Sequence, residues 1–291
     1  VVLAAGTAAY GRELAGVMDL ESLGGVVTKA VSREPRKGAP APRVAEFEGG
    51  MINAVGLANP GLDSVIREDL PWLSEHLRTT RVIVNVIGKT LEDFAEVVAA
   101  LDGVARVDAF ELNVSCPNVK AGGMEFGADP ATLTDLIQRA RGRTSKPLFV
   151  KLSPVLPSIA DTARAAVDAG ADGLTLINTI PGLAVDIETR RPSLGFGSGG
   201  VSGPGLLPVG VLAVWKVTRA VKAPVIGVGG VARGADAIQY LMAGASLVGV
   251  GTAALRDPRA PARILAEMKA WLGAHSIKSV NDVVGTLEWP Q

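Results

Sequence analysis

Five amide and amine side chains stand at or near the ends of short apolar runs, where the interior of a strand would need apolar residues. They are Lys29, Asn85, Asn113, Lys151 and Asn178. A buried amide or ammonium group without a partner is costly. One such residue alone could be a satisfied structural polar group. Five in corresponding positions favour a binding site for a ligand with many polar edges.

The most specific segment is Asn113-Val114-Ser115-Cys116-Pro117-Asn118, which follows one of these runs. A lone cysteine is often a small buried hydrophobe, but the polar neighbours of Cys116 do not describe a core. No histidine stands nearby, so a Cys–His nucleophile is disfavoured. A thiol with an ordinary pKa near 8.5 is about 3 % thiolate at pH 7, which suffices to remove a proton from an activated carbon. We therefore predict that Cys116 is a general base.

Two glycine-rich turns follow the last two apolar runs. They are Gly227-Val228-Gly229-Gly230 and Gly249-Val250-Gly251-Thr252. Glycines let backbone N–H groups approach a phosphate, and a helix N-terminus after each turn would add a favourable dipole. Either turn alone is a weak signal, but the pair predicts a site for phosphate or a phosphorylated cofactor.

The elements that must position these residues are strands alternating with helices. Apolar, β-branched runs cover 1–5, 25–28, 82–86, 109–114, 148–152, 173–178, 225–228 and 247–250. Helical patterns cover 91–101, a segment opening at 129–130, and 158–169, 206–221, 234–243 and 258–272. This alternation predicts an α/β protein, a (β/α)₈ TIM barrel of one domain over residues 1–291. A doubly wound sheet is the alternative, but its glycine fingerprint would follow the first strand.

Two stretches, 31–62 and 179–206, break the alternation and are rich in glycine or proline. Both follow strands, so in a barrel both lie on the carboxyl-terminal face. We interpret them as an extended loop region around an active site.

The composition excludes several classes of protein. The 291 residues carry 29 Lys plus Arg and 29 Asp plus Glu, so no net charge attracts nucleic acid. One cysteine and two histidines exclude an internal disulfide and a four-ligand zinc or iron–sulfur site, and no metal is predicted. No run is long enough to span a bilayer and none resembles a signal peptide, so we expect a cytoplasmic protein. The chain begins at Val1 inside an apolar run, and we expect residues to precede it.

The residues around Cys116 resemble the catalytic loop of class 1 dihydroorotate dehydrogenases. The resemblance runs in order along nearly the whole chain. It includes Gly50-Met51-Ile52-Asn53-Ala54-Val55-Gly56-Leu57, Val150-Lys151-Leu152-Ser153-Pro154, Ile177-Asn178-Thr179 and both glycine turns. Class 2 enzymes carry serine at the base position, so Cys116 indicates class 1. The Asn-Ala-Val-Gly-Leu and Ile-Asn-Thr sequences are similar to the NAD-linked 1B subclass.

This resemblance implies that FMN lies across the mouth of the barrel. Lys151 would stabilise charge at the flavin N1/O2 edge, and the glycine turns would hold the phosphate. The implied cofactor-binding residues are Ala5, Gly6, Lys29, Ala30, Asn85, Asn113, Lys151, Ile177, Gly203, Gly229, Gly230, Gly251 and Thr252. Family members often have serine at the position of Ala5, a contact that backbone can also make. The family's N-terminal hairpin has no counterpart before Val1.

The resemblance also implies a substrate, dihydroorotate, stacked on the flavin. Cys116 would take the C5 proton while hydride leaves C6, and the loop 117–127 would be a lid hinged at Gly122-Gly123. The implied substrate-binding residues are Lys29, Asn53, Val55, Gly56, Leu57, Asn113, Asn118, Asn178 and Thr179.

The route of the electrons to NAD⁺ needs a partner, because this chain lacks ligands for an iron–sulfur cluster. The subclass implies a homodimer joined by electron-transfer subunits that carry FAD and a [2Fe–2S] cluster, a heterotetramer. The alternatives are a fumarate-linked class 1A enzyme, another flavin barrel such as a dihydropyrimidine dehydrogenase or a tRNA dihydrouridine synthase, and a non-catalytic barrel. A basic face expected of the tRNA enzyme does not fit a net charge of zero.

Overall fold

A closed barrel of parallel strands forms the centre of the molecule. The computed structural model describes residues 1–114 and 126–290. The strand order around the barrel is β1-β14-β13-β8-β7-β6-β5-β2. The strands are β1 (Val2–Leu3), β2 (Gly25–Val27), β5 (Arg81–Val86), β6 (Ala109–Asn113), β7 (Leu148–Leu152), β8 (Gly173–Leu176), β13 (Val225–Val228) and β14 (Leu247–Val250). Every predicted run contributes one of them, so the predicted (β/α)₈ barrel is confirmed and the doubly wound sheet is excluded.

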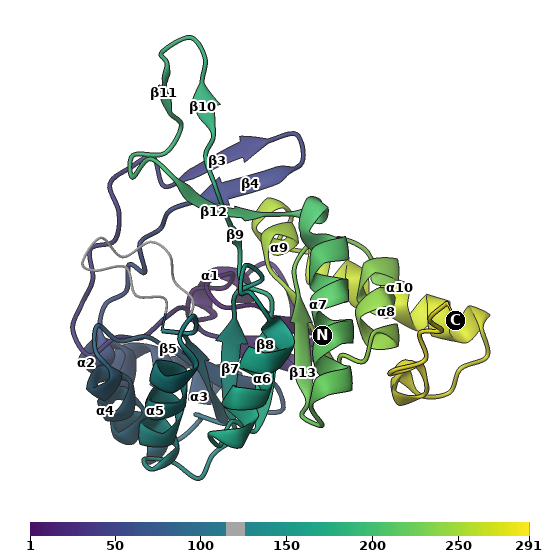
Figure 1. Cartoon of the computed structure of the whole chain (residues 1–291), viewed down its shortest axis with the longest axis horizontal. Helices are drawn as coiled ribbons and strands as arrows, with labels where there is room; N and C mark the ends of the chain where they lie inside the picture. Colours follow the sequence, from purple (N-terminus) through teal and green to yellow (C-terminus); the bar gives the residue numbers. More distant parts are fainter. Residues whose placement is uncertain (115–125, 291) are drawn as a thin grey trace.

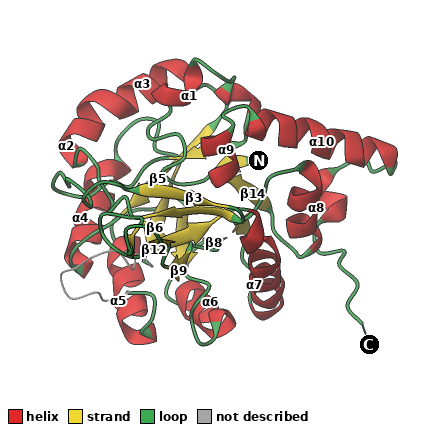
Figure 2. Cartoon of the chain, turned by 90° about the horizontal axis from the view of Figure 1, so that it is seen from above, coloured by secondary structure: helices red, strands yellow, loops and turns green. Residues whose placement is uncertain are grey.

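Helices surround the barrel, as Figure 2 shows from above. The longer ones are α3 (Leu70–His76), α4 (Leu91–Asp102), α5 (Pro130–Arg141), α6 (Ile159–Asp168), α7 (Leu207–Ala220), α8 (Gly234–Met242) and α10 (Ala260–Ala274). Short turns are α1 (Arg12–Ala15), α2 (Leu62–Ser64), α9 (Thr252–Arg256), η1 (Leu20–Ser22), η2 (Val65–Asp69), η3 (Pro204–Leu206) and η4 (Val280–Val283). No helix in residues 1–114 or 126–290 is long and apolar enough to cross a membrane.

Several helices begin where a side chain can accept hydrogen bonds from the free amides of the first turn. The side chain of Thr90 accepts from the N–H of Asp93 before α4, and Asp129 does the same for Thr132 before α5, whose first residue is Pro130. These caps fix where each helix starts relative to the strand before it.

The two stretches predicted as irregular loops contain strands, which corrects that prediction. β3 (Val44–Phe47), β4 (Gly50–Asn53), β12 (Gly199–Ser202) and β9 (Ile180–Gly182) form an antiparallel sheet in the order β3-β4-β12-β9. Figure 1 shows this sheet above the barrel, with the hairpin of β10 (Val185–Asp186) and β11 (Arg191–Pro192) projecting beyond it.

The sequence pattern did not predict β12, because this strand contains two glycines and glycine has a low preference for strands. The structure requires both of them. A Cβ at Gly199 would lie 2.5 Å from the Asn53 carbonyl oxygen, and a Cβ at Gly200 would lie 2.1 Å from the Thr179 hydroxyl oxygen. The strand can therefore approach β4 and Thr179 only without side chains at these positions.

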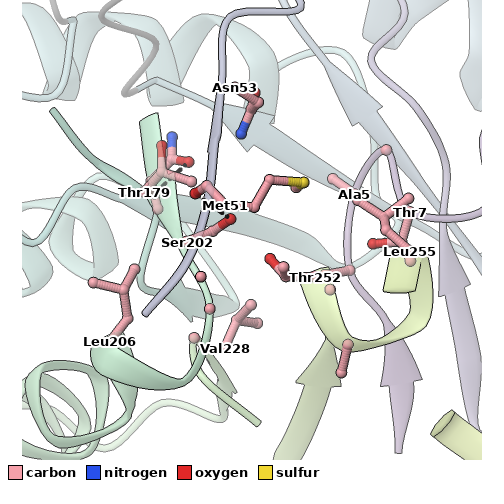
Figure 3. Close-up of a pocket in the computed structure, with 18 of the residues that line it drawn as sticks. Ala5, Thr7, Met51, Asn53, Thr179, Ser202, Leu206, Val228, Thr252 and Leu255 are labelled. Atoms are coloured by element: carbon pink, nitrogen blue, oxygen red, sulfur yellow. Dashed lines mark hydrogen bonds between the residues drawn. The ribbon is translucent and has the colours of Figure 1, made fainter. Parts of the chain in front are cut away.

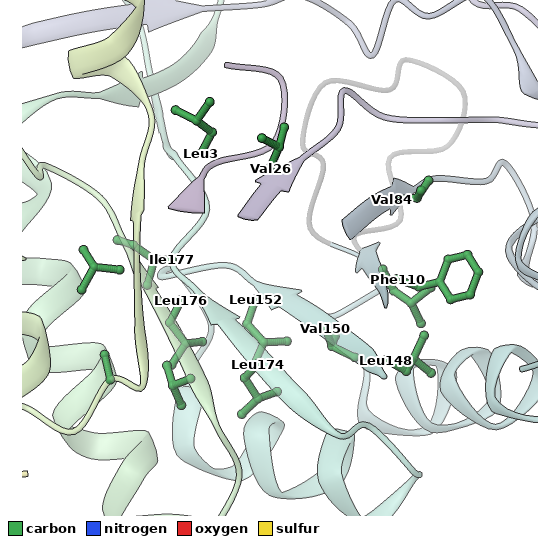
Figure 4. Packing of buried hydrophobic residues seen from close by; sticks show 14 of the residues in the cluster. Leu3, Val26, Val84, Phe110, Leu148, Val150, Leu152, Leu174, Leu176 and Ile177 are labelled. Atoms are coloured by element: carbon green, nitrogen blue, oxygen red, sulfur yellow. The ribbon is translucent and has the colours of Figure 1, made fainter. Parts of the chain in front are cut away.

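The apolar core divides between the outside and the inside of the barrel. Outward-facing side chains such as Val84, Phe110, Val150 and Leu174 pack against the helices (Figure 4). A smaller inner cluster fills the lower part of the barrel and includes Val2, Val27, Ile83, Ala109 and Ile226. The barrel is therefore solid at its amino-terminal end, and any internal space lies towards the carboxyl ends of the strands.

Candidate functional site

A cavity of about 1300 Å³ lies between the carboxyl ends of the barrel strands and the antiparallel sheet. In Figure 3, Asn53, Met51 and Thr179 lie on one side of it, and Ala5, Thr7 and Thr252 lie on the other. Pockets for one drug-sized ligand usually measure about 300–1,000 Å³. This cavity therefore has room for more than one small ligand.

The structure brings the predicted site residues together around this one cavity. Those within the described ranges all line it: Ala5, Gly6, Lys29, Ala30, Asn53, Val55, Gly56, Leu57, Asn85, Asn113, Lys151, Ile177, Asn178, Thr179, Gly203, Gly229, Gly230, Gly251 and Thr252. Cys116 and Asn118, together with the hinge glycines of the predicted lid, lie outside the described residues. Their roles stay predictions.

Buried polar side chains of β5, β6 and β8 form a hydrogen-bonded network at the floor of the cavity. Glu111 is 1 % exposed, and its carboxylate accepts hydrogen bonds from Asn85 Nδ2 at 2.7 Å and from Thr175 Oγ1 at 2.7 Å. Because a carboxylate only accepts, Asn85 must direct its Nδ2 towards Glu111. Its oxygen therefore faces the other way and can only accept.

Two amide oxygens in this wall have no hydrogen-bond partner in the part of the chain that the structure describes. Asn85 Oδ1 and Asn113 Oδ1 are buried and make no hydrogen bond among the described residues. Most buried polar atoms in folded proteins are hydrogen-bonded. Two orphaned acceptors that line one cavity indicate a ligand that brings N–H or O–H donors.

Two lysines add positive charge to the same cavity. Lys151 is 8 % exposed on β7, in register with Asn113 on β6 and Thr175 on β8. Lys29 follows β2, where its N–H donates to the Ala9 carbonyl at 2.7 Å.

The loop 55–61 is held in shape by a buried amide. Asn59 donates from Nδ2 to the Leu57 carbonyl at 2.9 Å, and its Oδ1 accepts from the Gly61 N–H at 2.9 Å. Leu57 has a φ of 57°, which non-glycine residues rarely adopt. Strained backbone of this kind is concentrated at ligand sites. Asn59 thus fixes a loop that offers its backbone to the cavity.

The glycine turn after β13 also lines the cavity. Gly230 has a φ of +75°, and a Cβ there would lie 2.4 Å from the Leu207 nitrogen. Only glycine fits this position, so its backbone is exposed to a ligand without a covering side chain.

The amino end of α8 differs from the prediction that it would attract a phosphate. Glu267 of α10 accepts from the Gly234 N–H at 2.6 Å, and Asp236 Oδ2 accepts from the N–H groups of Ala232 and Arg233 at 2.9 Å. The bond from Gly234 lowers the pKa of Glu267 below its ordinary value. The chain's own carboxylates thus occupy the amides at this helix end, which are not available to an anion.

Sequence reasoning missed part of the cavity wall. Met51, Ser202, Arg256 and Arg263 also line it. Met51 and Ser202 belong to the antiparallel sheet that the sequence did not reveal. Arg263 reaches from α10 and donates to the Ala232 carbonyl at 3.2 Å, beside the glycine turn. Its place on a distant helix gave no local signal in the sequence.

A parallel (β/α)₈ barrel with a polar cavity at the carboxyl ends of its strands is the architecture of an enzyme. The comparisons with known proteins specify which one. The dihydroorotate dehydrogenase family model matches residues 1–272. The chain belongs to the dihydroorotate dehydrogenase family.

Relatives and a solved structure agree with this assignment. The chain is 48 % identical to the dihydroorotate dehydrogenase B (NAD(+)), catalytic subunit, of Geobacter sp. (strain M21), over 99 % of this chain and 94 % of that protein. It is also 48 % identical, with the same coverage, to a Solibacter usitatus protein with the provisional name dihydroorotate dehydrogenase A (fumarate). The crystal structure of DHODH from Eimeria tenella in complex with ferulenol matches with a TM-score of 0.81 at 25 % identity, over 98 % of this chain and 84 % of that one.

Proposed function

We propose that this chain, acting as one domain over residues 1–291, is the cytoplasmic catalytic subunit that oxidises (S)-dihydroorotate to orotate in UMP biosynthesis. The observation that carries this proposal is the single cavity in which the predicted binding residues of the described ranges meet. The high identity to catalytic subunits of the NAD-linked enzyme supports the same reaction.

FMN is the cofactor that fits the cavity chemistry. When bound, it supplies the hydride acceptor. Asn85 and Asn113 offer buried acceptor oxygens, one for the ring N–H group and one for another N–H or O–H donor of the cofactor or substrate. Gly229, Gly230, Gly251 and Thr252 offer backbone for a phosphate on the opposite wall. We assign Lys151 to the N1/O2 edge of the ring, where an ammonium group stabilises developing negative charge.

The substrate would contact the amides and the loop on the sheet side of the cavity. Asn53 donates from Nδ2 to the Gly200 carbonyl at 3.3 Å, which leaves its oxygen for the substrate. The Asn178 oxygen accepts from the Thr179 N–H at 2.9 Å and fixes the orientation of that pair. Cys116 would remove the C5 proton as the hydride leaves C6, so the two C–H bonds are replaced by one C=C bond.

Replacing Cys116 tests the assignment of the base. We expect Cys116→Ala to slow reduction of bound FMN by dihydroorotate by about 10²- to 10⁴-fold, the range of general-base catalysis, while FMN stays bound. Ser115→Ala, one residue away, is the matched control and should react at nearly the wild-type rate. Loss of FMN from Cys116→Ala would show that this residue binds the cofactor instead.

The electron acceptor is the second part of the proposal. Relatives named catalytic subunits imply a complex with another chain, and we propose a heterotetramer with electron-transfer subunits that carry FAD and a [2Fe–2S] cluster. The isolated chain should then fail to reduce NAD⁺, and addition of the electron-transfer subunit should restore this reaction. The Solibacter usitatus relative makes fumarate the alternative. Turnover of the isolated chain with fumarate would favour that acceptor, and unaided reduction of NAD⁺ would contradict the need for a partner.

A further inference from the structure

A buried tyrosine lies directly behind the glycine turn that follows β13. Tyr240 of α8 is fully buried, and its hydroxyl group donates to the Gly229 carbonyl at 2.8 Å. Burial raises the pKa of this phenol above its ordinary value, so the hydroxyl group keeps its proton and remains a donor. The bond joins a barrel helix to the backbone of the cavity wall.

Two glycines make the space that this side chain occupies. A Cβ at Gly227 on β13 would lie 2.4 Å from a ring carbon of Tyr240, and a Cβ at Gly210 on α7 would lie 1.8 Å from its hydroxyl oxygen. The strand and the neighbouring helix thus both lack a side chain where the tyrosine passes between them. This slot fixes the position of the hydroxyl group.

The bond to Gly229 determines where the next N–H group points. The peptide between Gly229 and Gly230 is trans, so its C=O and N–H point in opposite directions. Tyr240 holds the C=O on the helix side of the turn. Gly229 and Gly230 both line the cavity. The N–H of Gly230 is therefore turned towards the cavity, and no backbone carbonyl within the described ranges accepts from it.

We propose that Tyr240 is a positioning residue for the phosphate of the cofactor: it holds the Gly229–Gly230 peptide so that the Gly230 N–H faces the anion. The neighbouring helix end cannot perform this task, because Glu267 and Asp236 already accept from its amides. This inference rests on the proposed FMN site and adds a residue that does not touch the cofactor.

Binding of FMN and of riboflavin by the same apoprotein tests the proposal, because the two ligands differ only in the phosphate. Tyr240→Phe keeps the ring in its slot and removes only the donor. We expect the dissociation constant for FMN to rise about 3- to 10-fold, the effect of one hydrogen bond, while that for riboflavin changes less than about twofold.

A matched control separates this effect from a general weakening of the packing between α7 and α8. Thr218 of α7 donates its hydroxyl group to the Ala243 carbonyl at 2.9 Å and does not line the cavity. Thr218→Val should lower the melting temperature without changing either dissociation constant.

The outcomes distinguish the inference from the function on which it rests. Unchanged FMN affinity in Tyr240→Phe, or equal loss for both ligands, would overturn the role of Tyr240 while leaving the FMN site intact. Wild-type protein that binds riboflavin as tightly as FMN would overturn the phosphate site itself.

Discussion

The two halves of the barrel wall differ in what they present to the cavity. On β5, β6, β7 and β8, the inward residue changes over one pleat from apolar or small to polar: Ile83 to Asn85, Ala109 to Glu111, Phe149 to Lys151 and Gly173 to Thr175. On the opposite side, β13, β14 and β1 are followed by glycine and alanine residues that line the cavity: Gly229-Gly230, Gly251 and Ala5-Gly6.

The difference teaches how one cavity can orient a ligand with two unlike ends. The half from β5 to β8, which we call the polar half, lines the cavity with polar side chains; under the proposed function these would bind the cofactor ring. The half from β13 through β14 to β1, the backbone half, lines it with glycine and alanine, whose N–H groups would bind the phosphate. Below both halves the barrel interior is filled by the apolar inner cluster.

Among substitutions in the described wall of the barrel, the largest effect should come from the charge in the polar half. Lys151→Met keeps the length of the side chain and removes the ammonium group. We expect the rate of FMN reduction to fall about 10²- to 10³-fold, as when one preorganised electrostatic contact to a developing charge is lost. Stopped-flow absorbance measures this rate, and a rate close to wild type would show that Lys151 has no part in the reaction.

The next largest effect should be a loss of folding stability when Glu111 in the polar half is replaced. Glu111→Leu removes the acceptor that Asn85 Nδ2 and the Thr175 hydroxyl group share, and a buried donor left without an acceptor costs about 1–3 kcal/mol. Urea unfolding of the apoprotein measures the loss. Glu96→Leu, which removes an exposed partner of Arg33, is the control and should change stability little. Equal losses in the two variants would contradict the account of the network.

A smaller change in the inner cluster should separate stability from chemistry. Ile83→Val removes one methylene group from the layer beneath Asn85, and we expect a loss of about 0.5–1.5 kcal/mol in unfolding free energy. FMN affinity and the rate of FMN reduction should not change. A slower reaction would show that the apolar layer also tunes the site.

The smallest effect concerns the opposite end of the barrel. Glu21 accepts hydrogen bonds from the Thr79 hydroxyl group and from the N–H groups of Arg78 and Thr79, which lower its pKa from 4.5 to about 2. Because the pKa of Glu21 is depressed in the folded state, its ionised carboxylate stabilises the fold above pH 4.5. This stabilisation is lost as the pH falls towards 2. The melting temperature of wild type should therefore fall more steeply over this range than that of Glu21→Gln. Parallel curves would contradict the shift.

The sequence revealed the polar half more completely than the region above it. Along β5, β6 and β7, polar residues follow apolar ones at the ends of the strands, and this pattern can be recognised in the amino-acid sequence. The sequence alone was therefore enough to place Asn85, Asn113 and Lys151 at the strand ends. The covering sheet could not be found in this way, because Gly199 and Gly200 are demanded by tertiary contacts with Asn53 and Thr179 rather than by local preference.

The backbone half shows a different limit of sequence reasoning. The glycine turns predicted where a phosphate would bind, but not which donors would serve it. Glu267, thirty-three residues after Gly234 and on another helix, occupies the helix end that the sequence left available. In the same way, the sequence indicates only that Tyr240 is a buried residue of an amphipathic helix. Its hydrogen bond to the Gly229 carbonyl is evident only in the structure.

The central claim is that this cavity oxidises dihydroorotate with bound FMN. Anaerobic mixing of the FMN-loaded chain with (S)-dihydroorotate, without any partner subunit, tests it most directly. We predict loss of the yellow flavin absorbance and formation of one orotate for each FMN. A flavin that stays oxidised under these conditions would contradict the account.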